Sequence, residues 1–476
     1  MTDTPQLQLF NSLTRQLEPF QPIHDGEARV YTCGPTVYNY QHIGNMRAYI
    51  FADTLGRTLS HKGFRLKHVI NITDVGHLTS DADAGDDKME KAAAAQGKSA
   101  WDIARYYQEV FEADLDRLHV RKPAHPRATD YVESMIEWGK GMQDEHCYEL
   151  DGGLYFDVST VPEYGQLARA VTEDGEGRID SVDGKRNPQD FAIWRKTPPG
   201  ETRQMEWDSP WGKGAPGWHL ECSVMSAELL GHPFDIHTGG IDHREIHHPN
   251  EIAQNQAHNC SSDSAAKIWM HNNFLIDRRG KMSKSSGEFL VLQTLVDRGY
   301  HPLAYRMMCL QAHYRSELEF SWEGLQAALT RLKRIVMLVE RIADAPAGGR
   351  TDHPKFAPVL EKFDAAIADD LNTAIALTAL EDALATKKID AGIKRAVVER
   401  IDAVLGLGLF DLARSDLRIR PKDAQLTEAE VDAAIERRKA ARAEKDFAAS
   451  DAIRDELVEK GVELMDGDPF GWEWKL

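Results

Sequence analysis

The region between residues 28 and 71 has the order strand, helix, strand. An apolar segment at residues 28–32 precedes an amphipathic stretch from about Met46 to His61, and a second apolar segment follows at residues 66–71. This order predicts the beginning of a parallel sheet whose strands are joined by a crossover helix. The tetrapeptide His-Ile-Gly-Asn at residues 42–45 lies where that helix opens. Since a helix N-terminus carries partial positive charge and unpaired N–H groups, it suits phosphates.

A second polar motif, Lys-Met-Ser-Lys-Ser, lies far downstream at residues 281–285. Holding the triphosphate of ATP in line for attack at its α-phosphorus requires donors and positive charge on two sides. His42 and Asn45 would supply an imidazole and an amide, and Lys281 and Lys284 would supply two ammonium groups. Each motif alone is a weak signal, but the ordered pair in a chain of 476 residues resembles the class I aminoacyl-tRNA synthetases. The resemblance implies that the chain forms an aminoacyl adenylate.

The composition is typical of an enzyme that works in water. Hydrophobic residues make up 42% and charged residues 28% of the chain, and the length predicts about three domains. No run approaches the ~20 apolar residues of a membrane span, and the N-terminus lacks the layout of a signal peptide. The five cysteines are scattered and odd in number, so a disulfide framework is not expected. We therefore expect a cytoplasmic enzyme without a membrane partner.

The net charge of −19 argues on average against a nucleic-acid partner. A large acidic enzyme can still carry a local basic stripe, and residues 331–334 and 437–445 are candidates for one. The alternative is that both segments are solvated helix faces.

The order of strand and helix signals along the chain predicts an α/β multidomain protein. Residues 122–214 are rich in Gly and Pro with short strand signals such as residues 153–158, and sheet signals return at residues 233–237 and 267–270. Helical periodicity then dominates at residues 329–345, 356–385, 392–405, 428–443 and 448–460. The predicted domains are a Rossmann-like parallel-sheet catalytic domain (1–121 and 215–262), a connective insertion (122–214), a connector carrying the lysine motif (263–330), a helical bundle (331–424) and a small C-terminal module (425–476).

Four residues have side chains that together suit a metal ion: Cys33, Cys222, His247 and Glu251. Two thiolates, an imidazole and a carboxylate fit Zn²⁺. Spacing alone is a weak argument, because the chain has no Cys-x-x-Cys pair. The alternative is that the two cysteines are buried apolar residues.

The segments around these residues resemble the bacterial cysteinyl-tRNA synthetases. So do residues 9–15, Asn-Ile-Thr-Asp at residues 71–74 and Lys-Arg-Asn-Pro-Gln-Asp-Phe at residues 185–191, and the similarity extends over essentially the whole chain. The resemblance implies one zinc ion per chain, held by the four residues above and binding the thiolate of substrate cysteine. It further implies L-cysteine, ATP with Mg²⁺ and tRNA(Cys) as substrates. We expect a monomer.

A soft metal explains how cysteine is told from serine. It binds thiolate strongly and a protonated alcohol poorly, and a site built around one polar contact can reject the analogue by ~10⁴-fold or more. We therefore expect no editing domain, and residues 122–214 are short for one.

The resemblance places further residues in the pocket. Thr73 and Trp218 are expected at the cysteine site, although plain core packing is an alternative for Trp218. Adenosine is expected at Gly34, Gly239, Gly240 and Asp242, with Asp242 accepting hydrogen bonds from the ribose hydroxyls. Four further histidines support the zinc ligands, contact the substrate carboxylate or are structural: His219, His237, His243 and His248.

The sequence has three notable features relative to the family pattern. The first motif of the family usually ends in His or Asn, and Asn45 here can donate a hydrogen bond but cannot carry charge. Ser-Gly-Glu at residues 286–288 replaces a common Leu-Gly-Asn. Pro249 stands where the family often has Glu. Because proline suits the first helical position, the helix is predicted to begin at Pro249, with His247 before it rather than on one face with Glu251.

The C-terminal module resembles the family's anticodon-binding domain. By that resemblance, the anticodon contacts are Arg442, Phe447, Asp451 and Asp466, where an aromatic surface and polar groups read unpaired bases. The alternative for Phe447 is a place in the helix core. Two rival functions remain. A ligase joining cysteine to an amino-sugar shares zinc and adenylation but lacks this module, and a non-catalytic RNA-binding paralogue is expected to have lost a lysine or a metal ligand.

Overall fold

A four-stranded parallel sheet forms the centre of the computed structural model. Its strand order is β10-β9-β3-β4, from β3 (Glu27–Thr32), β4 (Arg65–Ile70), β9 (Phe234–Gly240) and β10 (Ala266–Asn272). The structure describes residues 5–76, 88–168, 184–277, 280–281 and 290–476. The predicted strands at 28–32, 66–71, 233–237 and 267–270 are confirmed.

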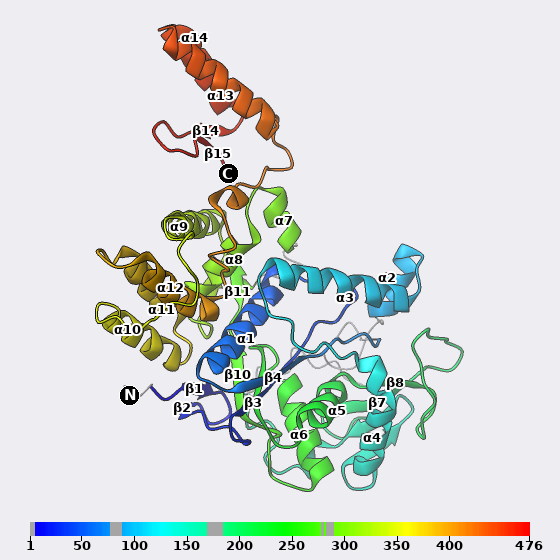
Figure 1. Ribbon diagram of the computed structural model, residues 1–476. Coiled ribbons are helices and arrows are strands. Elements are labelled where there is room, and N and C mark those ends of the chain that lie inside the picture. The colour runs from blue at the N-terminus through cyan, green and yellow to red at the C-terminus, as the bar shows by residue number, and fades with distance from the viewer. Residues whose placement is uncertain (1–4, 77–87, 169–183, 278–279, 282–289) are drawn as a thin grey trace.

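Helices cover both faces of this sheet (Figure 1). On one face Ala28 and Val30 of β3 pack with Phe51 of α1 (Ile43–His61), the crossover helix between β3 and β4. On the other face Tyr31 packs with residues of α5 (Trp218–Leu230) and α6 (His247–Asn259). Because successive side chains of a strand point to opposite faces, β3 is buried on both sides, as parallel strands are.

The segment predicted as an insertion forms its own antiparallel sheet. Its strand order is β5-β6-β7-β8, from β5 (Cys147–Leu150), β6 (Gly153–Phe156), β7 (Phe191–Lys196) and β8 (Gly214–Pro216). The helix α4 (Val132–His146) packs against this sheet and against α5 and α6. The insertion therefore rests on the helices that cover the central sheet.

The predicted helical stretch at residues 356–385 is two helices, α10 (Ala357–Ala368) and α11 (Thr373–Ala385). Between them Asp370 and Leu371 have φ values of 50° and 60°. The carboxylate of Asp370 accepts hydrogen bonds from the backbone N–H of Phe10 (2.9 Å) and the hydroxyl of Tyr314 (2.6 Å). Contacts with distant residues thus break a periodic pattern that by itself predicts one helix.

The remaining helices and strands complete the body. The helices are α2 (Lys88–Gln96), α3 (Ala100–Arg117), α7 (Leu292–Asp297), α8 (Pro302–Leu310), α9 (Trp322–Glu340) and α12 (Ala391–Leu405). The short strands are β1 (Gln8–Asn11), β2 (Gln16–Pro19), β11 (Leu275–Asp277), β12 (Gly280–Lys281) and β13 (Leu318–Glu319).

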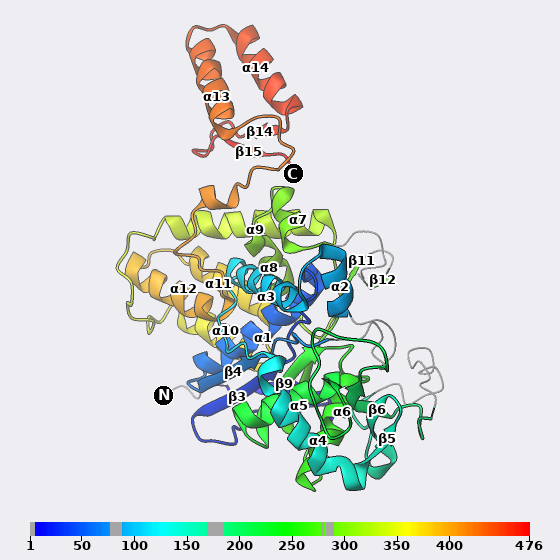
Figure 2. The ribbon, with the colours of Figure 1, turned by 90° about the vertical axis from the view of Figure 1, so that its right-hand side faces the viewer.

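A small C-terminal module projects from the helical part of the molecule (Figures 1 and 2). It contains α13 (Glu428–Ala443), α14 (Phe447–Glu459), β14 (Val462–Leu464) and β15 (Trp472–Trp474). The guanidinium of Arg418 lies 4.3 Å from the ring centroid of Phe470 and 3.8 Å from that of Trp472. The predicted helices at 428–443 and 448–460 are confirmed, and the domain limits themselves stay predictions.

Within the described ranges, the structure contains no helix with the length and apolar character needed to cross a membrane.

Candidate metal and adenylation site

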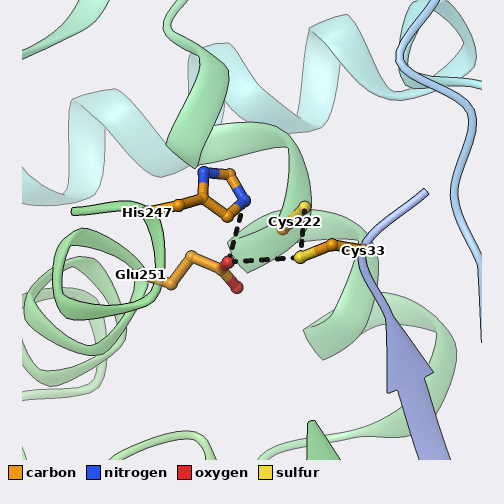
Figure 3. Close-up of side chains that lie close together, drawn as sticks. All are labelled: Cys33, Cys222, His247 and Glu251. Atoms are coloured by element: carbon orange, nitrogen blue, oxygen red, sulfur yellow. Dashed lines mark hydrogen bonds and ion pairs between the residues drawn. The ribbon is translucent and has the colours of Figure 1, made fainter. Parts of the chain in front are cut away.

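The four predicted metal ligands converge in the structure (Figure 3). One donor atom each from Cys33, Cys222, His247 and Glu251 lies within 4.8 Å of the others. The two Sγ atoms are 4.0 Å apart, Cys33 Sγ is 3.9 Å from Glu251 Oε1, and His247 Nε2 is 3.0 Å from the same oxygen. Donors around a tetrahedral zinc at about 2.0–2.3 Å lie roughly 3.3–3.8 Å apart. The donor set and the spacing therefore both fit zinc.

Three separate segments supply these ligands. Cys33 directly follows β3, Cys222 lies one turn into α5, and α6 carries both His247 and Glu251. The prediction that this helix begins at Pro249 is wrong, because α6 begins at His247 and the two ligands lie at i and i+4 on one helix face. Pro249 fits the first turn because N–H groups there have no acceptor within the helix.

The cluster is buried and charged. Burial raises the pKa of the Cys33 thiol well above its usual range. A hydrogen bond from Cys33 lowers the pKa of Cys222 to about 6, against the effect of burial. Burial alone would raise the pKa of Glu251, but the charges of His237 and His247 outweigh it and lower that pKa to about 2. The two cysteines thus lie beside a carboxyl group and each other rather than in purely apolar surroundings.

Further histidines surround this cluster. His237 Nε2 lies 2.8 Å from Glu251 Oε2, and His219 Nδ1 lies 2.8 Å from His247 Nδ1. Cys33, His237, His248 and Glu251 form a second group of donor atoms within 4.8 Å of one another. Hydrogen bonds of this kind fix the tautomer and orientation of metal-binding side chains.

The expected cysteine-site residues lie beside the cluster. Trp218 is half-buried, with its ring centroid 4.3 Å from that of His247. Thr73 is buried, and its hydroxyl donates a hydrogen bond to Glu221 (2.7 Å). Trp218 therefore contacts one predicted ligand directly, and Thr73 contacts the residue before Cys222.

Two polar residues were missed by sequence reasoning. Asn71 accepts a hydrogen bond from the N–H of Gly34 (2.8 Å) and lies 3.8 Å from Cys222 Sγ. Glu221 is buried and accepts a hydrogen bond from the Thr73 hydroxyl. A signal for Asn71 exists, because it follows β4 as Cys33 follows β3, and the carboxyl ends of neighbouring parallel strands share one edge of the sheet.

His42 caps the crossover helix. Its Nδ1 accepts a hydrogen bond from the N–H of Asn45 at 3.2 Å. A neutral His42 consequently carries its proton on Nε2. A Cβ atom at Gly44 would lie 2.8 Å from the His42 ring, which explains the glycine of the motif. The side-chain amide of Asn45 donates a hydrogen bond to Gln41 Oε1 at 2.8 Å.

The predicted adenosine residues lie at the ends of two neighbouring strands. A Cβ at Gly34 would overlap the carbonyl oxygen of Asn71 at 1.4 Å, and one at Gly239 would lie 2.7 Å from the rings of His243 and His248. Gly240 ends β9 and is followed by the exposed Asp242. Glycine here lets the backbone approach the histidines closely.

The lysine motif lies mostly outside the described residues. Lys281 belongs to β12 and pairs with Ile276 of β11. Lys284 and residues 286–288 fall outside the part of the chain that the structure describes.

The four predicted anticodon residues lie on the C-terminal module. Phe447 is 62% exposed, which excludes a place in the helix core. Arg442 Nη1 lies 3.7 Å from Asp466 Oδ1, and Asp451 pairs with Arg454 at 3.1 Å. All four side chains are exposed.

Comparison with known proteins gives a consistent result. Residues 19–330 match the family model described as the tRNA synthetases class I (C) catalytic domain. The chain is 68% identical over 478 residues to a Novosphingobium aromaticivorans protein named cysteine–tRNA ligase, covering 99% of this chain and 97% of that protein. It is 52% identical over 501 residues to the Zymomonas mobilis protein of that name, covering 98% and 97%. The matched lengths include the C-terminal module.

Solved structures show the same architecture. Methionyl-tRNA synthetase from Mycobacterium tuberculosis, bound by methionyl-adenylate, superposes with a TM-score of 0.54 at 15% identity, covering 82% of this chain and 92% of that one. The Agrobacterium radiobacter LeuRS in a ternary complex with tRNA gives a TM-score of 0.55 at 12% identity, covering 82% and 84%. At these identities the likeness concerns the fold, and the predicted α/β multidomain class is confirmed.

Proposed function

The chain belongs to the cysteinyl-tRNA synthetases, the ligases that join cysteine to tRNA, and we propose that it recognises cysteine through a zinc ion held by Cys33, Cys222, His247 and Glu251. The observation that carries this proposal is the convergence of these four donors from three segments of the chain. A zinc ion held there would act as a Lewis acid that binds the substrate thiolate, and the alcohol of serine is a poor replacement ligand.

Burial of the four donor residues supports selectivity for a thiol substrate. The donor group is closed off from solvent, with Cys33, Cys222, His247 and Glu251 all buried. An amino acid without a thiol would offer the zinc no thiolate to bind, and discrimination of ~10⁴-fold or more would follow without editing.

The first chemical step is adenylate formation. A carboxylate oxygen of cysteine attacks the α-phosphorus of ATP, the bond from that phosphorus to its bridging oxygen breaks, and pyrophosphate leaves. Mg²⁺ bound to ATP would neutralise part of the phosphate charge. His42, capping the positive end of α1, donates to the phosphates through Nε2. Lys281 and Lys284 stabilise the charge that builds up in the transition state. Asn45 takes part by turning its amide from Gln41 toward the phosphates, and Gly34, Gly239, Gly240 and Asp242 hold adenosine.

The second step transfers cysteine to tRNA(Cys). A hydroxyl of the terminal adenosine attacks the carbonyl carbon of the adenylate, and AMP leaves. Arg442, Phe447, Asp451 and Asp466 read the anticodon from the projecting module, since an exposed ring and exposed polar groups suit unpaired bases. The cytoplasmic location and the monomeric state remain predictions.

Cys222→Ser tests the zinc proposal. Because a hydroxyl does not replace a thiolate as a ligand, zinc content should fall from about one ion per chain, and cysteine-dependent ATP–pyrophosphate exchange should fall with it. Cys260→Ser is the matched control, since Cys260 is exposed and outside the cluster. Normal metal content and normal exchange in Cys222→Ser would remove the zinc assignment.

A further inference from the structure

Two exposed tyrosines form a fixed pair near the first motif. Tyr40 is 40% exposed and Tyr106 is 39% exposed, and their hydroxyl oxygens lie 3.0 Å apart. Beneath them Tyr107 is buried, with its ring centroid 5.1 Å from that of Tyr40 and 5.0 Å from that of Tyr106, both edge-on. Gln96 donates a hydrogen bond to the Tyr107 hydroxyl at 3.1 Å. The pair is therefore held from below, while much of each outer ring stays in solvent.

Core packing does not explain this arrangement. Tyr107 is 7% exposed and belongs to the hydrophobic core, whereas the two outer rings do not. A folded protein gains little from keeping two large rings about 40% exposed side by side, and contiguous exposed aromatic surface marks an interaction site.

The pair lies close to His42 of the first motif. Tyr40 precedes His42 by two residues, so their Cα atoms are at most about 7.6 Å apart. Tyr106 belongs to α3, which packs on α1 through Phe111 and Tyr49, whose ring centroids are 4.9 Å apart (Figure 1). A nucleotide bound on these rings would therefore lie close to the first motif.

Positive charge accompanies the rings. The Nζ atom of Lys98 lies 5.2 Å from the ring centroid of Tyr106, and both Lys98 and the neighbouring Arg105 are exposed. Flat π-faces beside an ammonium group suit unpaired nucleotides, because bases stack on the rings and phosphates meet the cation. The exposed Asp102 and Glu109 lie four and three positions from Tyr106 on the same helix, so the rings and Lys98, and not a basic patch, are the features that suit RNA here.

We propose that Tyr40 and Tyr106, with Lys98, bind the unpaired 3′-terminal nucleotides of tRNA by base stacking and guide the terminal adenosine into the site. This rests on the proposed transfer step, which requires that end of the tRNA to reach the adenylate. The tyrosines act as positioning residues and take no part in adenylate formation.

Tyr106→Leu in the full-length enzyme is the informative variant, since it keeps apolar bulk and removes the ring. The KM for tRNA in aminoacylation should rise about 5-fold to 100-fold, because stacking contributes ~1–3 kcal/mol per base. Cysteine-dependent pyrophosphate exchange should stay within about twofold. Tyr106→Phe keeps the ring and should restore the KM, which a role of the hydroxyl pair in folding would not allow.

Binding of a shortened tRNA tests whether Tyr106 contacts the 3′-terminal nucleotides. With tRNA lacking its unpaired 3′-terminal nucleotides, measured by fluorescence anisotropy, wild type and Tyr106→Leu should bind equally. A normal KM in Tyr106→Leu overturns the proposal, and so does an equal loss of binding with the shortened tRNA. A parallel loss of pyrophosphate exchange would assign the tyrosine to the adenylation site itself and also overturn it.

The same binding assay separates this proposal from the function on which it rests. If the wild-type enzyme charges no tRNA, the proposed function fails, whereas anisotropy with a labelled single-stranded RNA still reports whether Tyr106 contributes to binding. Absence of any RNA binding by the wild-type surface would overturn the proposal and leave a protein partner as the remaining occupant.

Discussion

The Nε2 atom of His237 lies 2.8 Å from the Oε2 atom of Glu251, and both side chains are 1% exposed. Glu251 directs its other oxygen toward His247, 3.0 Å away. His237 therefore fixes the direction in which Glu251 presents an oxygen to the metal position.

His237→Ala should weaken zinc retention by about 10-fold to 100-fold, the usual effect of removing a hydrogen-bond partner of a metal ligand. Competition with a chromophoric chelator measures this. His258→Ala is the control. His258 lies on α6, as Glu251 does, but it stacks on Trp138, with ring centroids 3.8 Å apart. Equal zinc affinity in both variants would show that Glu251 needs no support.

Lys284→Ala should slow adenylate formation by about 10²-fold or more while changing cysteine binding little. The ammonium group acts mainly where negative charge builds up in the transition state. Rapid-quench measurement of adenylate formation tests the rate. Lys140→Ala, an exposed lysine paired with Glu137 on α4, should behave as wild type. A normal rate with a raised KM for cysteine would contradict the role.

Phe447→Ala should raise the KM for tRNA about 5-fold to 100-fold through loss of one stacking contact. Val458→Ala on the same helix, where Val458 is 47% exposed, removes apolar surface without removing a ring and should leave the KM unchanged. Pyrophosphate exchange should be normal in both. An unaltered KM in Phe447→Ala would mean that this ring does not read tRNA.

Asp53→Asn should lower the free energy of unfolding by about 3–5 kcal/mol, because it leaves a buried guanidinium without its counter-charge. Asp53 Oδ2 lies 2.6 Å from Arg306 Nη2 and 2.7 Å from Arg57 Nε, and Arg306 is fully buried. Urea unfolding measures the change. The exposed pair Arg350–Asp352 supplies the control Asp352→Asn, for which at most about 1 kcal/mol is expected.

The same ion pair predicts a pH effect. Burial raises the pKa of Asp53, but Arg306 and Arg57 outweigh burial and lower it overall. A carboxylate with a depressed folded pKa stabilises the protein above its unfolded pKa of ~4 and loses that contribution as pH falls through the folded value. The stability difference between wild type and Asp53→Asn should therefore be full at pH 7 and shrink below about pH 4. A difference independent of pH would indicate that charge is not its cause.

Local patterns predicted the strands of the central sheet well. Continuous apolar runs bounded by polar segments placed β3, β4, β9 and β10, because a strand buried on both faces needs such a run. The ligand set came from family resemblance rather than spacing, since Cys33 and Cys222 are brought together only by the packing of α5 on β3.

The errors have physical causes. Proline marks the first turn of a helix but does not say which of its positions it occupies, so α6 begins two residues before Pro249. The break between α10 and α11 depends on Asp370 reaching Phe10 and Tyr314, which lie far away in the sequence. The helical periodicity of a sequence segment carries no information about contacts with residues so distant in the chain.

The origin of the four metal ligands in three segments makes the site an indicator of completed folding. Cys33 and Cys222 are separated by 189 positions, and a loop of that length closes only at a large entropic cost in an unfolded chain. Under the zinc proposal, tight metal binding would be confined to chains in which β3 has already met the segment beyond the insertion. The metal content of a preparation would then report the fraction of correctly assembled molecules, and a chelator would remove a link between the end of β3 and the helices α5 and α6.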